Sequence, residues 1–561
     1  MAEQKSQLDK FGIAAALQEI ARLMELKGGQ YRFKAKAYNA GARSIQSVGD
    51  LDRLVRKNLL TTLPRIGGAL ASQITQLYLT GESSVLKELR KEFPPGVVEL
   101  SGVPGLSLSK VQQLHEQGIS SVAELKAAAE AGQIRDLKGF GAKTEQRLLE
   151  TLAAKKERRT HRLHLHHALN TAEQVIEFMK TFRGLVDISF AGSLRRWKET
   201  VGTIEIVASG KKPDALIEHF LRYPHIVSSE SSDSNNCLAQ FVDGARVSLT
   251  AVVPAEFAVT LFLKTGSESH LASLANVEFA KIPKREEEIY KRLRMQYIPP
   301  ELRENEGEIE AALAGDLPED LVTLADVKGM VHCHTTYSDG KHTLEAMVRG
   351  AEAMGMKYIT ITDHSPTAFY AGGVKIDDLR RQWDEIDELQ DEVKIKILRG
   401  TESDILADGR LDYPDDILEK FDVIVASIHS RYKMNAEKMT ERVITAMRQP
   451  VFKIWGHALG RLIERRPPFE CDVERILDAV AESDAAVEIN GDPYRLDMEP
   501  RWVREARKRK IKFLISVDAH SVGAMNNLKF GVAMARRGWV RRGEVLNTLT
   551  PAAFQKAVRP V

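Results

Sequence analysis

The chain has 561 residues, 43% of them hydrophobic and 28% charged, which is ordinary for globular protein and predicts about three or four domains of roughly 150 residues each. Its 80 basic and 78 acidic side chains leave a net charge of +2, so any surface that binds nucleic acid must be a local patch. The sequence has no apolar run of about 18 residues, no signal-peptide core and only three cysteines, so we expect a cytoplasmic protein without a membrane partner.

Residues 1–155 have the pattern of short helices joined by glycine turns. Apolar side chains recur at helical spacing from Ile13 to Leu23, and Gly28 with Gly29 ends that helix. Three further glycine turns, each preceded by an apolar residue and followed by a helical pattern, lie within residues 63–74, 100–114 and 137–149.

These turns have the form of helix-hairpin-helix motifs, which aim backbone N–H groups at a DNA phosphate without reading bases. One such turn would equally suit a plain corner between two helices, but three in one helical segment predict binding to the DNA or RNA backbone. The middle copy is poorer because Ser107 occupies the place of a second glycine. The residues expected to contact DNA are Gly67, Gly68, Gly105, Gly139, Gly141 and Lys143.

A basic, histidine-rich stretch, KKERRTHRLHLHH (155–167), follows. Its histidines, His161, His164, His166 and His167, suggest a metal site, but they have no cysteine or carboxylate at ligand spacing. We therefore favour a solvated basic helix or linker.

From 170 to about 300, helical and strand patterns alternate, which predicts a small α/β domain with an antiparallel or mixed sheet. The stretch GSLRRWKETVGTIEIVAS (192–209) opens like a nucleotide-binding turn and closes like a strand. An Asp-x-Asp pair on such a strand would hold catalytic magnesium, but here the two positions are Thr203 and Glu205. The stretch is therefore a working nucleotidyltransferase motif, a disabled one or a chance match.

The last part of the chain repeats a strand and a helix. Apolar strands are predicted near residues 330, 360, 397, 424, 454, 488 and 515, with helical stretches between them. Units of this length build parallel sheets or barrels, in which function is found at the carboxyl ends of the strands.

Imidazole and carboxylate side chains follow these strands. The candidate metal ligands are His332, His334, Asp339, His364, Glu402, His429, His457, Asp518 and His520. Six of the last seven histidines of the chain are among them, which a chance arrangement does not explain; His342 is the exception, and the sixth strand ends in Glu488 and Asn490.

Such ligands suit Zn²⁺, Mn²⁺ or Fe²⁺. Nine ligands are too many for one ion, so we expect two or three ions, with Glu402 able to bridge two of them. A site of this kind makes hydroxide from water and stabilises a phosphate ester in displacement, so we predict phosphoester hydrolysis.

Residues 325–525 resemble the PHP (polymerase and histidinol phosphatase) domain, which implies a (β/α)₇ barrel with three metal ions. By this resemblance His332, His334, Glu402 and Asp518 hold the first ion. Glu402, His429 and His457 hold the second ion, and Asp339, His364 and His520 hold the third.

The resemblance extends over nearly the whole chain. ELKGGQYRFKAKAY (25–38), the glycine turns, GSLRR and YIPPELRENEGEIEAALAG are similar to a bacterial family X DNA polymerase. That family implies a multidomain α+β and α/β protein whose PHP domain supplies manganese-dependent 3′→5′ exonuclease and related repair-type activity. The implied domains are an 8-kDa-like helical domain (1–80), a helix-hairpin-helix region (81–155), a palm and thumb (156–315) and a PHP domain (320–561).

The palm departs from the family pattern, which reads G-D-I-D and, in a neighbouring strand, R-V-D-L. This chain has Gly202-Thr203-Ile204-Glu205 and Arg246-Val247-Ser248-Leu249, so two of three carboxylates are replaced and the third is a longer Glu. Mg²⁺ needs such carboxylates, so we expect none in the palm. Asp243 has an odd offset from Ser248, which predicts that it lies on the opposite strand face.

Other family residues are retained. The phosphate-binding turn keeps Gly192, Ser193, Arg195 and Arg196, and Thr265-Gly266-Ser267 matches the sugar-contacting turn. Nucleotide binding and a purely scaffolding role explain this retention equally well. At the position of the lyase lysine the chain has Gln73, with Ala69 one turn earlier, and without an amine we expect no Schiff-base lyase activity.

We therefore expect a monomeric DNA-processing hydrolase that acts on gapped, nicked or 3′-ended DNA, with Arg461 holding phosphate in the barrel. Two alternatives stay open. Glu205 and an unrecognised carboxylate hold Mg²⁺ in a working polymerase, or the front half binds DNA while the barrel hydrolyses a small phosphate monoester.

Overall fold

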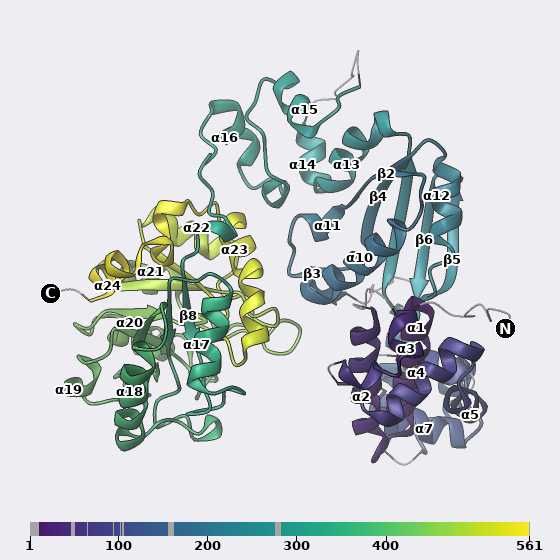
Figure 1. Ribbon diagram of the computed structural model, residues 1–561, viewed down its shortest axis with the longest axis horizontal. Coiled ribbons are helices and arrows are strands. Elements are labelled where there is room, and N and C mark those ends of the chain that lie inside the picture. The colour runs from purple at the N-terminus through teal and green to yellow at the C-terminus, as the bar shows by residue number, and fades with distance from the viewer. Residues whose placement is uncertain are drawn as a thin grey trace. The chain divides into compact units, whose positions relative to one another are not determined.

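The computed structural model (Figure 1) describes residues 10–46, 51–63, 65–93, 95–100, 103, 106–137, 139–154, 162–274 and 282–559. The chain divides into two compact units. The first comprises residues 1–163, 170–190 and 202–257, and the second comprises residues 164–169, 191–201 and 258–561. The turn GSLRR therefore groups with the second unit, whereas the strand that carries Glu205 (Ile204–Gly210) groups with the first.

The amino-terminal part of the first unit is helical. Its helices are α1 (Lys10–Lys27), α2 (Tyr31–Gln46), α3 (Leu51–Arg56), α4 (Gly68–Thr80), α5 (Ser84–Glu92), α6 (Pro95–Leu100), α7 (Leu108–Glu116), α8 (Val122–Glu130) and α9 (Ala142–Ala154). The predicted first helix is confirmed, because Ile13, Leu17 and Ile20 are fully buried along one face of α1. Gly28 ends the helix with φ +73°, a conformation that other residues rarely adopt.

Two of the three glycine turns precede helices as expected. Gly67 and Gly68 are exposed at the start of α4, and Gly139 and Gly141, with φ +86° and +72°, lie just before α9. Gly105 and the side chain of Lys143 lie outside the described residues. In the middle copy Ser107 caps α7, its hydroxyl accepting a hydrogen bond from Lys110 N, so the serine replaces a glycine turn with a side-chain cap.

The first unit also holds the mixed sheet. Its strands, in spatial order, are β2 (Leu185–Phe190), β4 (Ile204–Gly210), β7 (Arg246–Val252), β6 (Asn236–Phe241) and β5 (Ile226–Asp233). Only the β4–β7 pair is parallel. Helix α12 (Pro213–Phe220) packs on these two central strands, and α10 (Leu165–Met179) precedes β2.

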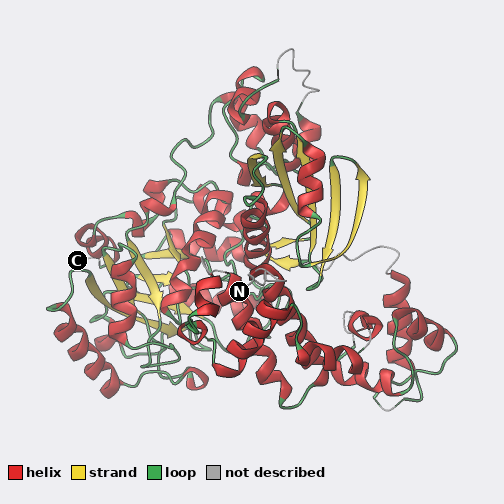
Figure 2. Cartoon of the chain, turned by 45° about the vertical axis from the view of Figure 1, so that its right-hand side comes forward, coloured by secondary structure: helices red, strands yellow, loops and turns green. Residues whose placement is uncertain are grey.

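The second unit contains the predicted barrel, drawn with its strands enclosed by helices in Figure 2. Its parallel strands are β8 (Gly329–Cys333), β9 (Tyr358–Ile361), β10 (Lys396–Asp404), β11 (Val423–Ser427), β12 (Lys453–Trp455), β13 (Ala485–Asn490) and β14 (Phe513–Ser516). A bridge between Cys333 and Ala519 brings the first and last strands together, so the sheet is nearly closed.

Helices separate and surround these strands (Figure 1). They are α17 (Leu344–Ala353), α18 (Ile376–Gln390), α19 (Asp415–Leu418), α20 (Ala436–Met447), α21 (Val473–Ala481), α22 (Pro500–Lys508), α23 (Leu528–Arg537) and α24 (Pro551–Val558). Every residue of β8, β9 and β11 is buried, as expected for parallel strands covered on both faces.

One end of the barrel is closed by apolar packing. Phe554 of α24 is fully buried and stacks on Tyr358 at a ring separation of 4.7 Å, within a cluster that includes Val331, Leu398 and Leu514. The amino-terminal end of the barrel is therefore filled, and the polar side chains gather at the carboxyl ends of the strands.

Several short elements precede the barrel. They are α11 (Gly192–Arg195), which forms the turn GSLRR, β3 (Thr200–Val201), α13 (Phe257–Thr265), α14 (Glu268–Ser273), α15 (Glu286–Arg292) and α16 (Glu308–Ala314). Their centre is Arg303, which is fully buried among the rings of Phe262, Tyr290 and Tyr297 and pairs with Glu286 at 2.6 Å.

The histidine-rich stretch packs more than a solvated linker does. His161 lies outside the described residues. His164, in the two-residue strand β1 (Leu163–His164), and His166 are half-buried, and their rings lie 5.3 and 4.9 Å from that of Tyr494. Burial and the neighbouring His167 lower the pKa of His166 to about 3. The solvated interpretation is therefore wrong for these two side chains.

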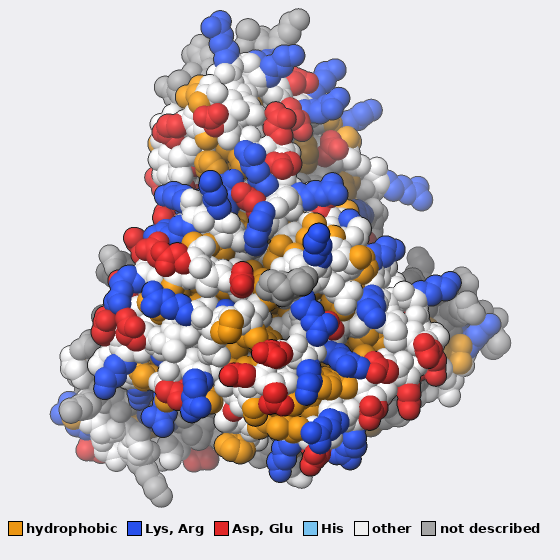
Figure 3. Space-filling view, turned by 90° about the vertical axis from the view of Figure 1, so that its left-hand side faces the viewer, with side chains coloured by type: hydrophobic (Ala, Val, Ile, Leu, Met, Phe, Trp, Pro, Cys, Tyr) orange, Lys and Arg blue, Asp and Glu red, His pale blue; other side chains and the backbone are white. Residues whose placement is uncertain are grey.

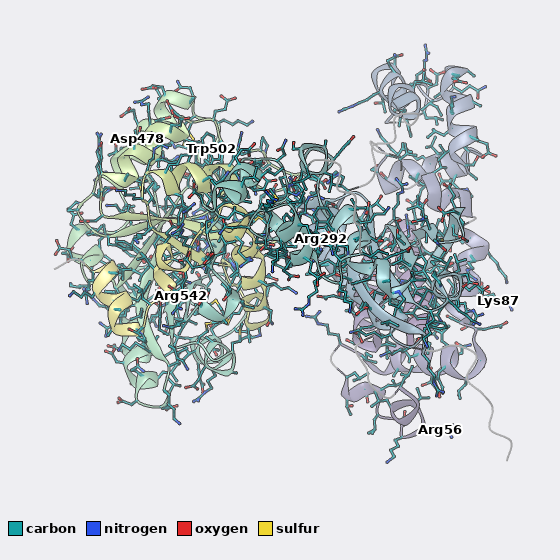
Figure 4. All side chains as sticks on the ribbon, turned by 90° about the horizontal axis from the view of Figure 1, so that it is seen from above. Arg56, Lys87, Arg292, Asp478, Trp502 and Arg542 are labelled. Carbon is teal, nitrogen blue, oxygen red and sulfur yellow. The ribbon has the colours of Figure 1, made fainter. Side chains whose placement is uncertain are left out.

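Basic residues of the carboxyl-terminal part are mostly paired. Arg507 contacts Glu544 at 2.7 Å and Arg509 contacts Asp478 at 2.6 Å; Asp478 and Trp502 are labelled on the outside of this unit in Figure 4. On the face drawn in Figure 3, basic and acidic side chains are intermixed. None of the helices in the described ranges is long and apolar enough to cross a membrane.

Candidate metal centre

The barrel topology brings the predicted ligands to one rim. His332 lies within β8 and Glu402 within β10, while His364, His429, His457 and Asp518 follow β9, β11, β12 and β14 by two or three residues. Parallel strands present their carboxyl ends at the same edge, so residues from six strands converge. A bridge between His364 and Glu402 continues the β9–β10 pairing to this rim.

Glu402 is the centre of the cluster. It is 1% exposed, and its two carboxylate oxygens lie near five imidazole rings. The distances are 3.4 Å to His332 Nε2, 3.5 Å to His334 Nε2, 3.0 Å to His364 Nδ1, 3.3 Å to His429 Nε2 and 2.8 Å to His457 Nε2. A single carboxylate therefore contacts histidines of all three ligand groups that the resemblance implies.

Two aspartates complete the cluster on either side of His334. Asp518 Oδ1 lies 3.1 Å from His334 Nε2 and 3.5 Å from His332 Nε2. Asp339 Oδ1 lies 3.2 Å from His520 Nε2, 3.6 Å from His364 Nε2 and 3.8 Å from His334 Nδ1.

Three overlapping groups have potential ligand atoms within 4.8 Å of one another. They are His332, His334, Glu402 and Asp518; His334, Asp339, His364 and His520; and His364, Glu402 and His429. The first group has the composition expected from the resemblance. The second adds His334 to the expected set, and the third contains His364 where the resemblance implied His457, which contacts Glu402 instead.

Several buried polar atoms at this rim have no hydrogen-bond partner. They include His332 Nε2, His334 Nδ1 and Nε2, His364 Nδ1, Glu402 Oε2, His457 Nδ1 and Asp518 Oδ1. An unpaired polar atom inside a protein is costly, and such atoms converging on one place fit a bound cation. The donor set of imidazole and carboxylate suits Zn²⁺, Mn²⁺ and Fe²⁺ alike.

The backbone is strained at three of these positions. His332, His457 and Asp518 have φ values of +67°, +24° and +51°, which residues other than glycine rarely adopt. Strain of this kind persists where the surroundings impose it, and it concentrates at functional sites.

The electrostatics keep the carboxylates ionised. Burial raises the pKa values of Glu402 and Asp518, but the surrounding histidines outweigh it and hold both well below their ordinary values. Burial conversely lowers the pKa of His332, yet Glu488, Glu402 and Asp518 raise it well above the usual value. Carboxylates and protonated histidines therefore face one another at the rim, and a divalent cation bound there would displace the imidazole protons.

Two carboxylates that sequence reasoning did not assign orient the histidines from behind. Glu488 accepts at 2.5 Å from His332 Nδ1, and Ser516 and Asn490 donate to its oxygens. Asp404 accepts at 2.6 Å from His429 Nδ1. A hydrogen bond to the far ring nitrogen fixes the tautomer and leaves Nε2 for a metal. Because Glu402 and Asp404 are two apart on one strand, they share a face, which would have indicated this role.

The arginine nearest the cluster is not the predicted one. Arg461 is 5% exposed and pairs with Glu199 at 2.8 Å and Glu499 at 3.2 Å. Arg495, by contrast, has Nε 3.4 Å from Asp518 Oδ2 and a buried Nη1 without a hydrogen-bond partner. A guanidinium placed there is suited to bind phosphate beside the candidate ligands.

In the first unit, Glu205 of β4 is paired in register with Ser248 of β7, and Thr203 lies just before β4. Asp243 is not on a strand face. It lies in the turn between β6 and β7, where its carboxylate accepts from Ala245 N at 2.9 Å. The expectation that it faces the other side of the strand is therefore wrong, because β7 begins only at Arg246.

The arginines of the retained turn are engaged by glutamates. Arg195 contacts Glu286 at 2.5 Å and donates to Thr265 Oγ1, while Arg196 contacts Glu304 at 2.9 Å and donates to Thr265 O. Gly192 has φ +60° in this turn, and Ser267 caps α14 two residues after Thr265, beside Gly266. These contacts favour the scaffolding interpretation. At the lyase position, Gln73 accepts from Ser83 Oγ at 2.9 Å.

Comparisons with family models agree with this division of the chain. Residues 331–492 match the model described as PHP domain. Residues 9–83 match a helix-hairpin-helix domain, and residues 97–154 match a SAM-like helix-hairpin-helix tandem. PHP domains are metal-dependent, and seven of the nine residues of the His/Asp/Glu cluster lie in the matched part, with Asp518 and His520 after it.

Relatives of two kinds match. The chain is 32% identical to the "DNA polymerase/3'-5' exonuclease PolX" of Bacillus subtilis, over 96% of this chain and 97% of that protein. A "probable phosphatase" of Thermoanaerobacter sp. is 27% identical over 39% of this chain and 89% of its own length, and one of Caldanaerobacter subterraneus is 28% identical over 34% and 74%. The chain belongs to the bacterial family X DNA polymerases that carry a carboxyl-terminal PHP domain.

Proposed function

We propose that this protein is a metal-dependent phosphodiesterase that shortens DNA from its 3′ end at the barrel site, and that its palm does not polymerise. The observation that carries the proposal is the contrast between the two sites. Nine His, Asp and Glu residues meet at the barrel rim, whereas Glu205 of the palm strand faces Ser248.

The ligands proposed are His332, His334, Asp339, His364, Glu402, His429, His457, Asp518 and His520. Divalent ions bound there would supply hydroxide at neutral pH and stabilise charge on the leaving oxygen. Glu402 links the ligand groups, Glu488 and Asp404 hold His332 and His429 in one tautomer, and Arg495 orients the phosphate.

The palm lacks what two-metal chemistry needs. Carboxylates from neighbouring strands must face each other to hold Mg²⁺, and here one of the facing positions is a serine hydroxyl. Among the described residues, no group of three or more potential ligands converges outside the barrel. The helix-hairpin-helix regions at 9–83 and 97–154 would bring DNA to the protein, with phosphate contacts at Gly67, Gly68, Gly139 and Gly141.

The test uses a 5′-labelled primer annealed to a longer template, with Mn²⁺ and with or without deoxynucleoside triphosphates. Shortening without extension is expected. His332→Ala should remove the shortening, and His342→Ala is the matched control because that exposed histidine lies outside the cluster. Extension that survives His332→Ala would contradict the proposal for the palm.

A second candidate is hydrolysis of a small phosphate monoester, which the relatives named as probable phosphatases favour. Turnover of p-nitrophenyl phosphate without any shortening of DNA, and without DNA binding at low salt, would select it. A steep salt dependence of DNA affinity would instead indicate phosphate contacts and counterion release.

A further inference from the structure

Two aromatic residues that are neighbours in sequence are exposed, and the second of them, Tyr370, lies at the edge of the metal centre. Phe369 is 86% exposed and Tyr370 is 69% exposed, in a short turn after β9. The ring of Tyr370 lies 6.0 Å from that of His364 and 6.1 Å from that of His429. Single exposed apolar residues are common on protein surfaces. An exposed aromatic pair beside the candidate metal-ligating histidines instead indicates a surface that binds another molecule.

The turn that carries these rings is firmly held. Ala368 and Ala371, on either side of the pair, are 1% and 3% exposed. Thr367 donates from its backbone N to Asp412 at 2.7 Å and from its hydroxyl to Asp404 at 3.0 Å. Val374 N donates to His364 O at 2.8 Å, so the carboxyl-terminal end of the turn is hydrogen-bonded to the segment after β9 that carries His364.

Close packing fixes the same turn at Gly373. A Cβ there would lie 2.0 Å from Ser365 O, so the turn lies against the segment that carries His364. The backbone that carries the two rings is therefore fixed before any ligand binds, which lowers the entropic cost of binding. Asp404 also holds His429, so the turn and the ligands share one support.

We propose that Phe369 and Tyr370 form a stacking platform for unpaired nucleobases at the 3′ end of a DNA strand. This inference rests on the proposed function, because the platform would hold the bases while their phosphodiester lies at the metal centre. Every base has a flat π face, so stacking tolerates any sequence. A base within a paired duplex has both faces covered, so the platform favours 3′ ends that are single-stranded or have frayed from the template.

Basic residues near the candidate ligands in sequence supply positive charge for the phosphates of the DNA strand. Arg431 and Lys433 follow His429 within four residues and are both exposed. Arg495 adds a third positive charge, with Nε 3.4 Å from Asp518 Oδ2. A strand whose phosphates meet these cations and whose bases meet the rings has the combination of a basic groove and aromatic faces that single-strand binding uses.

The first experiment compares KM and kcat of the Mn²⁺-loaded protein with those of the double variant Phe369→Ala/Tyr370→Ala. The substrates are a 5′-labelled single strand with ordinary 3′-terminal nucleotides and the same strand with baseless tetrahydrofuran residues there. We expect the variant to raise KM for the ordinary strand about tenfold or more, with little change in kcat. For the baseless strand the two proteins should have the same KM.

Two further variants distinguish the effect of aromatic stacking from that of apolar side-chain volume. Phe369→Tyr/Tyr370→Phe keeps both rings and should behave like the parent. Phe369→Leu/Tyr370→Leu keeps apolar volume without π faces and should resemble the alanine variant. A parent-like KM for the leucine or the alanine variant would overturn the platform.

A binding measurement separates this inference from the proposed function. A single strand ending in 2-aminopurine, with a methylphosphonate at the last linkage to block hydrolysis, should lose fluorescence on binding the parent protein but not the alanine variant. If DNA is shortened while both proteins quench equally, the platform is wrong and the function stands. If quenching differs but no DNA is ever shortened, the proposed function is wrong and the platform stands.

Discussion

Glu205 and Ser248 are register partners in the one parallel strand pair of the palm sheet. In this position a second carboxylate would share a cation with Glu205, and a serine hydroxyl cannot replace its charge. Thr203, just before the same strand, also lacks a carboxylate, so the proposal that the palm is inactive rests on two neighbouring positions.

Glu205→Gln is therefore predicted to change nothing in DNA processing. Removing the last carboxylate of an inactive site should leave the rate of shortening within about twofold, and primer extension should be undetectable before and after. The measurement is a time course with labelled primer-template and Mg²⁺ or Mn²⁺. Extension by the parent that Glu205→Gln abolishes would show that the palm works.

Glu402→Gln is predicted to remove activity and metal together. This carboxylate contacts five histidines, so its loss should cost more than the roughly 100-fold upper value for residues that only orient ligands. Metal content per chain, measured by mass spectrometry after dialysis, should fall in parallel with the rate. His342→Ala is the control. Full metal content with full activity would contradict the role given to Glu402.

Glu488→Gln is predicted to act through His332. The variant keeps the shape of the side chain but weakens the 2.5 Å hydrogen bond to His332 Nδ1, and partners of this kind contribute about 10- to 100-fold to metal affinity or activity. A Mn²⁺ titration of the shortening rate should show a raised requirement for metal, relieved at high Mn²⁺. A rate loss that Mn²⁺ does not relieve would assign Glu488 a different role.

The two arginines should separate activity from stability. Arg495→Met should lower kcat/KM for DNA about 100-fold, because a guanidinium that holds the phosphate is lost. Its thermal midpoint should change little, because Asp518 stays paired with His332 and His334. Arg461→Met should instead lower the thermal midpoint, by a destabilisation of about 2–3 kcal/mol, because it leaves Glu199 and Glu499 without their cation. The opposite outcome would restore Arg461 as the phosphate ligand.

Lys453 supplies a pH dependence of stability. Burial lowers its pKa to about 8, well below the ordinary value of 10.5. Between these two pH values the unfolded chain binds the proton and the folded chain does not, so stability rises with pH by about 3 kcal/mol. Urea unfolding at pH 7 to 10 should show this rise in the parent relative to Lys453→Met. Parallel curves would contradict it.

The barrel can be predicted from the sequence because the patterns that specify its strands and helices are local and repeated. A buried strand, a polar strand end and a helix recur seven times, and parallel strands must bring those ends together. The sequence pattern alone therefore places His332 and Glu402 at one rim. The hairpin-like turns at Gly67 and Gly139 follow from equally local rules of helix starts.

Residues that act through tertiary packing could not be predicted in this way. Arg461 and Arg495 both follow barrel strands, and only the three-dimensional path of their segments shows that one pairs with Glu199 and the other with Asp518. The pairing of His166 with Tyr494 joins positions more than 300 residues apart. The prediction for Asp243 is wrong because the strand starts later than its apolar alternation indicates.

The proposed function assigns hydrolysis of DNA to the barrel and no polymerase activity to the palm. One experiment compares the two activities directly. The parent and His332→Ala are each incubated with 5′-labelled primer-template, Mn²⁺ and all four deoxynucleoside triphosphates, and the products are resolved by length. We expect shorter products with the parent and an unchanged primer with His332→Ala. Products longer than the primer with His332→Ala would contradict the proposed function.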